Sequence, residues 1–183
     1  MQFQYNTDRL QLRILDDMNA ESVLEFYANG KESFNAVEPP KTADFYTIPY
    51  QSAVLKSEFS GFLRGTYARY YIFHIANPTI IIGTVSFSNI LRGPYNSCII
   101  GYKLLPEYRG KGYASEAVSR LINAVFSENF IHRIEAYVLP SNTASIKLLA
   151  GLGFTCEGVA RSVIKLSDGY RDHNRYVLIN PMD

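Results

Sequence analysis

The chain lacks the features that mark several common protein classes. Its 183 residues include only two cysteines, Cys98 and Cys156, which are too few for a disulfide scaffold and do not have the spacing of metal ligands. Lysine and arginine (18) nearly balance aspartate and glutamate (17), so no broad charge favours nucleic acid or a membrane surface. No apolar run approaches the ~20 residues of a membrane span, and the N terminus has no apolar signal-peptide core. We expect a cytoplasmic protein with no metal site, no membrane contact and no direct nucleic-acid binding.

The composition favours a single globular unit. Apolar residues make up 47% of the chain and aromatic residues 14%, which is enough for one well-filled core at this length. No break in composition suggests a boundary, so we expect residues 1–183 to form one domain.

The middle of the chain predicts a strand, a glycine turn and a helix. The apolar run 99–105 has the length of a buried strand, and apolar residues recur at helical spacing over 114–126. Gly110 and Gly112 stand in the turn between them. A following strand over 133–139 completes a βαβ unit, whose two strands should be parallel with a right-handed crossover.

That glycine turn is suited to bind an anion. The first N–H groups of a helix have no partner and lie at the positive end of its dipole, so a phosphate satisfies them. Gly110 and Gly112 leave room for the backbone to close around the anion, and Arg109 and Lys111 add positive charge. The same residues also suit a plain tight connection with solvated basic side chains.

The other segments predict a mixture of strands and helices. Asp168-Gly169 predicts a tight hairpin near the C terminus, Asn77-Pro78 predicts a second turn, and residues 30–50 are interpreted as irregular. Strands are expected over 9–14, 67–75, 80–89, 154–166 and 170–179, and helices from Asp16 or Asp17 to Ala28, over 51–64, and from Ser141 or Asn142 to the glycines at 151 and 153. The fold class is therefore α+β, mostly antiparallel.

Two nucleotide-binding motifs fit this order poorly. A P-loop requires serine or threonine after its lysine, but Lys111 is followed by Gly112. A dinucleotide fingerprint requires a third glycine where Ser115 stands, and it follows the first strand of repeated βαβ units. A nucleotide-binding domain remains the weaker alternative.

Several motifs resemble one enzyme family. Arg109-x-x-Gly112-x-Ala114 is similar to the Arg/Gln-x-x-Gly-x-Gly/Ala signature of the GCN5-related N-acetyltransferases (GNAT). Further motifs, spread from about residue 9 to 179, resemble the RimJ branch of the RimJ/RimL ribosomal-protein N-terminal acetyltransferases: Asn89-x-x-Arg92-Gly93, Gly101-Tyr102, His132-Arg133-Ile134, Pro140-x-Asn142, Leu148-Leu149-Ala150-x-Leu152-Gly153-Phe154, Glu157-Gly158, Asp168-Gly169 and Asp172-His173. The resemblance implies the GNAT fold, a twisted, mostly antiparallel sheet with one splayed parallel βαβ unit and helices on both faces.

The resemblance also implies a reaction. Acetyl-CoA would donate its acetyl group by direct attack of a primary amine, most simply the N-terminal α-amino group of a ribosomal protein. The backbone at Lys103, Leu104 and Leu105 would bind the pantetheine, with help from Asn142. The pyrophosphate would lie against the turn formed by Arg109, Gly110, Lys111, Gly112, Tyr113 and Ala114.

The catalytic groups are less obvious. Leu149 stands where many family members have a tyrosine that protonates the leaving thiolate, so Ser145 is the expected substitute, with Asn142 beside it. Both residues are also good helix caps. Ile164 occupies the position of a glutamate base in the RimL branch, which leaves Glu38 as first candidate for the base.

Other carboxylates, histidines and functions stay open as alternatives. Glu135 is the second candidate for the base, and His74, His132 and His173 are interpreted as structural histidines. The alternative functions are acetylation of a small amine, such as a polyamine, antibiotic or amino-acid-like compound, and a non-catalytic acyl-CoA-binding module.

Overall fold

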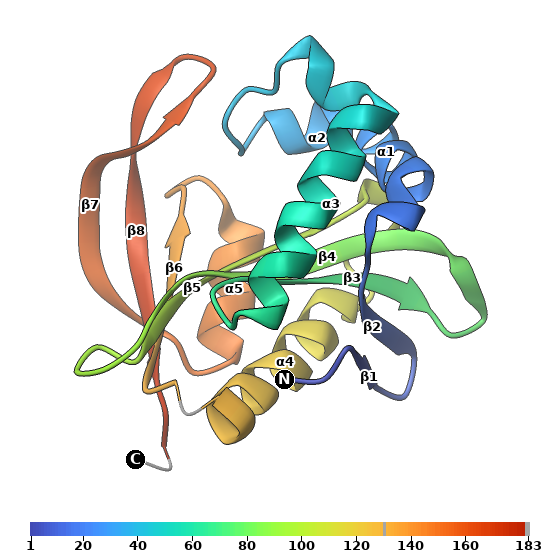
Figure 1. The fold of residues 1–183 in the computed structure, drawn as a ribbon. Helices are drawn as coiled ribbons and strands as arrows, with labels where there is room; N and C mark the ends of the chain where they lie inside the picture. The colour runs from blue at the N-terminus through green and yellow to red at the C-terminus, as the bar shows by residue number, and fades with distance from the viewer. Residues whose placement is uncertain (130, 182–183) are drawn as a thin grey trace.

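A twisted sheet runs through the computed structural model, which describes residues 1–129 and 131–181. Within them the strand order is β1-β2-β3-β4-β5-β6-β8-β7 (Figure 1). The strands are β1 Gln4–Asn6, β2 Leu10–Ile14, β3 Ala68–His74, β4 Asn77–Leu91, β5 Ser97–Leu104, β6 Arg133–Val138, β7 Thr155–Leu166 and β8 Gly169–Ile179. Only β5 and β6 pair in parallel among them, which confirms the predicted α+β class and its one parallel unit.

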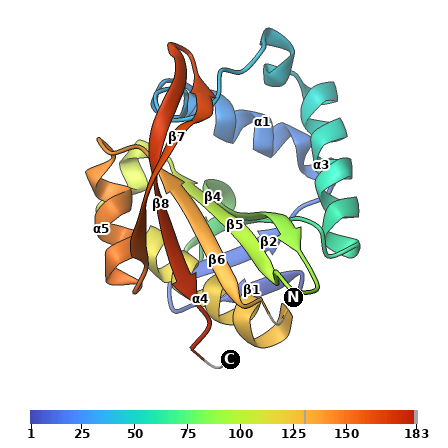
Figure 2. The same cartoon turned by 90° about the vertical axis from the view of Figure 1, so that its left-hand side faces the viewer.

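Helices cover both faces of this sheet. Helices α4 and α5 lie on one face, and α1 and α3 lie on the other (Figure 2). Helix α2 adds Phe34 to the core on the α1 and α3 side. The α-helices are α1 Ala20–Asn29, α2 Lys31–Asn35, α3 Ile48–Leu63, α4 Tyr113–Asn129 and α5 Thr143–Gly151, with short 3-10 turns η1 Asp17–Asn19, η2 Ala43–Tyr46 and η3 Pro106–Tyr108. None of the helices in the described chain is long and apolar enough to cross a bilayer.

The central strand β3 explains how one sheet supports two cores. Successive side chains of a strand point to opposite faces. Tyr70 and Ile72 accordingly join the core beneath α4, whereas Tyr71 and Phe73 join the core beneath α1–α3. All four side chains are buried. This explains why the strand has apolar or aromatic residues at successive positions instead of alternating with polar ones.

Three parts of the fold differ from the sequence prediction. Strand β1 was not expected, because three residues are too few to show an alternating pattern. Residues 30–50 are not wholly irregular, since they contain α2 and η2, both shorter than the period needed to recognise a helix. Helix α3 begins at Ile48 rather than 51, because Pro49 is compatible with a first turn and the Thr47 hydroxyl accepts a hydrogen bond from the Tyr50 N–H.

The two predicted turns have different outcomes. The hairpin of β7 and β8 is present as expected, but its two turn residues are Ser167 and Asp168, because Gly169, at a φ of 116°, already pairs with Leu166. The earlier turn lies at Ile75-Ala76, because Asn77 already pairs with His74 across the hairpin.

Gly83 provides a test of packing at the centre of the sheet. A Cβ at this position would lie 2.4 Å from Leu104 Cδ2 and 2.5 Å from the Lys103 carbonyl oxygen. We expect Gly83→Ala to lower the free energy of unfolding by about 1–3 kcal/mol, the usual cost of overpacking, in urea denaturation. Gly151→Ala is the control: its Cβ would meet nothing within 4 Å at the end of α5, so an equal loss in both variants would contradict this explanation.

Candidate active site

The site begins where two parallel strands separate. Strands β5 and β6 pair only over residues 97–99 and 133–135, and beyond this point β5 is paired with β4 alone. The Leu105 N–H donates to the Ile82 carbonyl on β4 at 2.9 Å. Since successive N–H groups of a strand alternate in direction, those of Leu104 and Tyr102 point toward the gap left by β6. The predicted splay is therefore present.

A long cleft occupies that gap, with a volume of about 680 Å³. It runs from the glycine turn, along β5, to the first turns of α5. Its lining residues are Ser33, Phe34, Val37, Tyr102, Lys103, Leu104, Arg109, Gly110, Gly112, Tyr113, Ala114, Ser115, Ser141, Asn142, Ala144, Ser145, Lys147 and Leu148. This set includes every predicted cofactor-binding residue except Leu105 and Lys111.

The glycine turn has the conformation that an anion site needs. Gly110 and Gly112 have φ values of 72° and 80°, in the left-handed region that favours glycine. Nothing lies within 4 Å of the place where a Cβ of Gly110 would stand. The turn and the first residues of α4, Tyr113 and Ala114, therefore border the cleft.

A clamp that the sequence did not reveal holds this turn in place. Arg9, just before β2, pairs with Glu116 of α4 (Nε to Oε2, 2.7 Å) and donates from Nη1 to the Lys111 carbonyl at 3.0 Å. Thr7 donates to the other oxygen of Glu116 at 2.5 Å. Burial opposes ionisation of Glu116, but the hydrogen bonds from Thr7 and Arg9 outweigh it and keep its pKa below the ordinary value.

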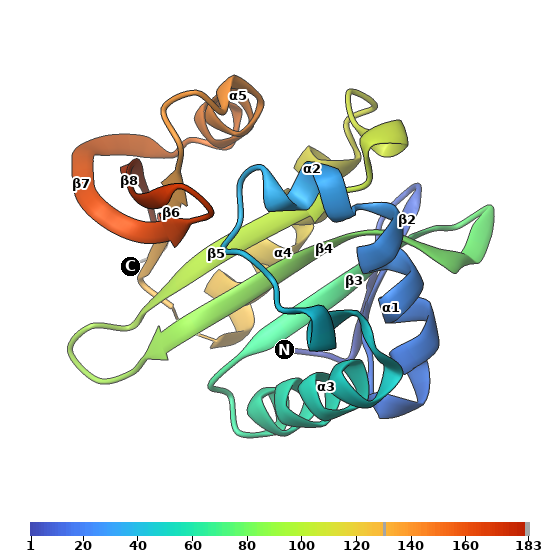
Figure 3. The same ribbon diagram turned by 90° about the horizontal axis from the view of Figure 1, so that it is seen from above.

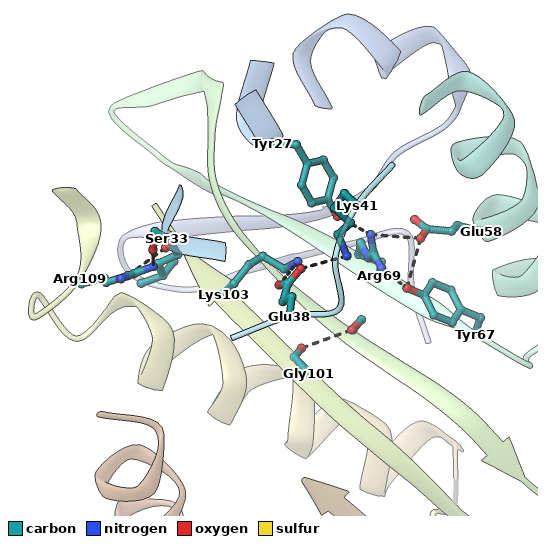
Figure 4. Close-up of polar contacts among 12 residues, drawn as sticks. Tyr27, Ser33, Glu38, Lys41, Glu58, Tyr67, Arg69, Gly101, Lys103 and Arg109 are labelled. Carbon is teal, nitrogen blue, oxygen red and sulfur yellow. Dashed lines mark hydrogen bonds and ion pairs between the residues drawn. The ribbon is translucent and has the colours of Figure 1, made fainter. Parts of the chain in front are cut away.

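The two basic side chains of the turn are placed differently. Arg109 lines the cleft, donating from Nε to the Leu104 carbonyl at 3.1 Å and from Nη2 to the Ser33 hydroxyl (Figure 4). The Lys111 ammonium lies over the ring of Tyr108, 5.6 Å from its centroid. Arg109 therefore joins β5, α2 and the turn.

At the other end of the cleft, Asn142 caps α5. Its Oδ1 accepts a hydrogen bond from the Ser145 N–H at 3.2 Å. Asn142 therefore caps the helix and also lines the cleft. The Tyr102 hydroxyl lies 3.4 Å from the Ser145 carbonyl oxygen. Burial raises the pKa of Tyr102 to about 12, and a hydrogen bond with Ser145 opposes this rise.

A second cavity, of about 280 Å³, lies against the first. The two share Val37, Tyr102, Lys103, Asn142 and Ser145. The remaining residues around the second cavity are Glu38, Pro39, Arg69, Thr84, Ser86, Ile100, Gly101, Ala136, Tyr137, Val138, Leu139, Ile164 and His173. Asn142 and Ser145 thus stand at the junction of the two spaces.

Glu38, the predicted base, is held by two lysines. It pairs with Lys103 from β5 and with Lys41 at 3.3 Å (Figure 4). Burial would raise the pKa of Glu38, but the two ammonium groups outweigh this effect and bring the pKa below its ordinary value. Burial lowers the pKa of Lys103, and Glu38 opposes that change. The geometry makes Glu38 a weak proton acceptor.

Arg69 forms a second buried network behind this pair. It donates to the hydroxyls of Tyr27 at 2.7 Å and Tyr67 at 2.6 Å, and lies 3.2 Å from Glu58 (Figure 4). Burial raises the pKa of Glu58 even though Arg69 opposes it. These contacts fix α1 and α3 to β3 and hold the guanidinium at the wall of the second cavity.

The remaining candidates separate clearly. Leu149 is fully buried in the core beneath α4, which explains why no donor stands there. Ile164 lines the second cavity. Glu135 lies outside both cavities and is bound to Arg133 at 2.7 Å and to the Tyr137 hydroxyl at 3.1 Å.

Sequence reasoning gave no site role to several polar residues of the second cavity: Arg69, Thr84, Ser86, Tyr102, Tyr137 and His173, although Tyr102 and His173 stand in the family motifs. The arginine stands alone in an apolar strand, a signal of a buried partner that could have been followed. Residues 1–129 and 131–181 contain no cluster of three or more histidine, cysteine or carboxylate side chains that could hold a metal.

Comparisons with known proteins agree with this geometry. A family model described as the acetyltransferase (GNAT) domain matches residues 9–155. The chain is 32% identical over 174 residues to the probable N-acetyltransferase YjcK of Bacillus subtilis, covering 95% of this chain and 96% of that protein. The chain belongs to the GNAT acetyltransferase family. It is thus an N-acetyltransferase with acetyl-CoA as cosubstrate, as predicted.

Two further relatives place this GNAT chain near the RimJ/RimL enzymes. It is 31% identical over 176 residues to the ribosomal protein uS5-alanine N-acetyltransferase of Escherichia coli, covering 96% of this chain and 90% of that one. The ribosomal-protein-S5-alanine acetyltransferase of Vibrio fischeri superposes with a TM-score of 0.93 at 28% identity, over 98% of each chain. The predicted family resemblance is confirmed.

The ion pair of Glu38 gives a testable consequence for this GNAT enzyme. Glu38→Gln leaves the largely buried Lys103 ammonium without its carboxylate, so we expect unfolding in urea at pH 7 to require about 3 kcal/mol less free energy. The pKa of Glu38 is depressed in the folded state, so its contribution is complete above the ordinary glutamate value of about 4.3 and is lost as pH falls through the folded pKa. The gap between variant and wild type should therefore close in acid.

A double variant is the control for that experiment. Glu38→Gln combined with Lys103→Met removes both charges and should recover most of the lost stability. Destabilisation that is the same at pH 7 and in acid, or a double variant no more stable than the single one, would contradict the role of the ion pair.

Proposed function

We propose that this enzyme acetylates the α-amino group of a protein N terminus, of the ribosomal-protein-alanine type. The observation that carries the proposal is the pair of cavities that meet at Asn142 and Ser145. One has the glycine turn and free strand edge suited to a CoA thioester, and the other is a smaller space with both polar and apolar lining. The similarity to the uS5-alanine enzyme supports an N-terminal amine as the acceptor.

The residues of the long cleft fit acetyl-CoA. Backbone N–H groups at 110–114 would bind the pyrophosphate, with Arg109 at the rim. The N–H groups of Tyr102 and Leu104, which point toward the gap left by β6, would bind the pantetheine amides in a strand-like arrangement, while the Leu104 carbonyl accepts from Arg109. Lys103 contributes through its position in β5, since its side chain is directed to Glu38.

The second cavity fits an extended N terminus. It lies between the β7–β8 hairpin, which supplies Ile164, and the segment after α2, which supplies Glu38 and Pro39 (Figure 3). A space of about 280 Å³ accommodates one small residue with its amine. The rest of a peptide would leave between the hairpin and that segment.

The reaction needs no nucleophile from the protein. The amine nitrogen attacks the thioester carbonyl carbon, an N–C bond forms, and the C–S bond breaks. A strand N–H at Leu104 or Tyr102 would stabilise the oxyanion. Ser145 would donate a hydrogen bond to the departing sulfur, and the Asn142 amide would orient the thioester beside it.

The acceptor is tested by following thiol release from acetyl-CoA with three kinds of amine. We expect peptides with an N-terminal alanine to be acetylated at the α-amino group, as read by fragment masses. Polyamines and amine antibiotics are the comparison. Preference for a small amine would replace the proposed acceptor, and acetyl-CoA binding without turnover on any amine would identify a non-catalytic module.

Ser145→Ala tests the leaving-group role. Loss of the hydroxyl should lower kcat by about 10²-fold, in the range of a general acid, while the dissociation constant of acetyl-CoA stays near the wild-type value. Thr143→Ala, in the same first turn of α5 but outside both cavities, is the matched control. Equal activity of the two variants would exclude Ser145 from the chemistry.

A further inference from the structure

His173 is buried and also lines the second cavity, where the acceptor amine is proposed to bind. Only 2% of its surface is exposed, yet it is one of the residues that line the second cavity. Its strand neighbours Tyr176 and Leu178 point into the core beneath α4. By the alternation of a strand, His173 projects from the opposite face of β8, the face that carries the acceptor cavity.

A backbone contact defines the tautomer of this imidazole. His173 Nδ1 lies 3.1 Å from the Arg171 carbonyl oxygen. A carbonyl oxygen can only accept, so Nδ1 carries a hydrogen, and in the neutral ring the lone pair is on Nε2. Nε2 is therefore the ring nitrogen that is free to accept a proton in this tautomer, and the bond from Nδ1 holds the ring in orientation.

The other ionisable groups around the same cavity are poor proton acceptors. Glu38 and Lys103 neutralise each other, and Arg69 is committed to Glu58 and two tyrosine hydroxyls. Burial raises the pKa of Tyr102 and also that of Tyr137, which faces the cavity from β6.

Strand β7, packed beside His173, supplies no competing base. The residue paired with His173 across the hairpin is Ala160, and the β7 residue that lines the cavity is Ile164. Among the described residues that line this cavity, His173 is thus the candidate base that takes part in no ion pair.

We propose that His173 is the catalytic base that takes a proton from the acceptor amine, a role that rests on the proposed function. The nitrogen lone pair attacks the thioester carbon while one N–H proton passes to His173 Nε2, directly or through one water. The C–S electron pair leaves with sulfur, next to Ser145. The imidazolium then returns its proton to solvent, so protons and electrons balance.

The sharpest test is His173→Asn. The asparagine amide keeps an N–H near the position of Nδ1, so the bond to the Arg171 carbonyl is preserved and only the base is removed. With an N-terminal alanine peptide, we expect kcat to fall by about 10²-fold or more, while acetyl-CoA binding and thermal stability stay near wild type. His132→Gln, an exposed histidine outside both cavities, should retain the wild-type kcat.

Two further measurements separate a base from a structural residue. Added imidazole should restore turnover to His173→Ala in proportion to its neutral fraction, which a packing role would not allow. In the wild-type enzyme with CoA bound, the NMR titration of the His173 ring should follow the same curve as the rising limb of kcat against pH.

The outcomes are distinct. Wild-type kcat and an unchanged pH profile in His173→Asn would overturn the assignment and leave the acetyltransferase function intact. If the variants fail to fold, the wild-type titration decides: a His173 curve that departs from the kcat limb overturns the proposal. A wild-type enzyme that acetylates no peptide would overturn the proposed acceptor first.

Discussion

The separation of β5 from β6 after three paired residues is the constraint on which the site depends. Had the pairing continued beyond Ile99, the N–H groups of Tyr102 and Leu104 would be bound to β6 and no cleft would exist. An unpaired strand edge inside a sheet is costly unless another group satisfies it. Under the proposed function a ligand with amides of its own would satisfy that edge, whereas the Leu104 carbonyl already accepts a hydrogen bond from Arg109.

The same separation requires firm support on both sides. The two helices beneath the sheet fix the far strand, since Leu149 of α5 and Val118 of α4 share one core with β6 residue Ile134. On the opposite face, the buried contacts of Arg69 and the pair between Glu38 and Lys103 tie the helical cover to β3 and β5. These ion pairs therefore serve mainly to fix the position of the segment after α2 against β5. Glu38 is better suited to this structural role than to accepting a proton.

Local patterns determined how much of this could be predicted from the sequence. The glycine turn, α4, the capping Asn142 and the C-terminal hairpin were all predicted, because each is specified by residues close together in the chain. Arg9 was missed, because its partner Glu116 is 107 residues away and no local pattern connects them. His173 was interpreted as structural for the same reason: only the folded sheet shows that its ring faces a cavity formed by β3, β5, β6 and the segment after α2.

The charge around the second cavity affects the protonation state of the proposed acceptor amine. The lining of that cavity includes Lys103, Arg69 and Glu38, which together carry one positive charge in excess. Lys41 and Glu58 pair with these residues from outside the lining, and their charges cancel. A nearby like charge disfavours an ammonium group, and a free α-amine ordinarily titrates near 7.7–8.0. An amine entering this space would therefore lose its proton more readily than in water, and in the proposed mechanism Nε2 of His173 would receive that proton.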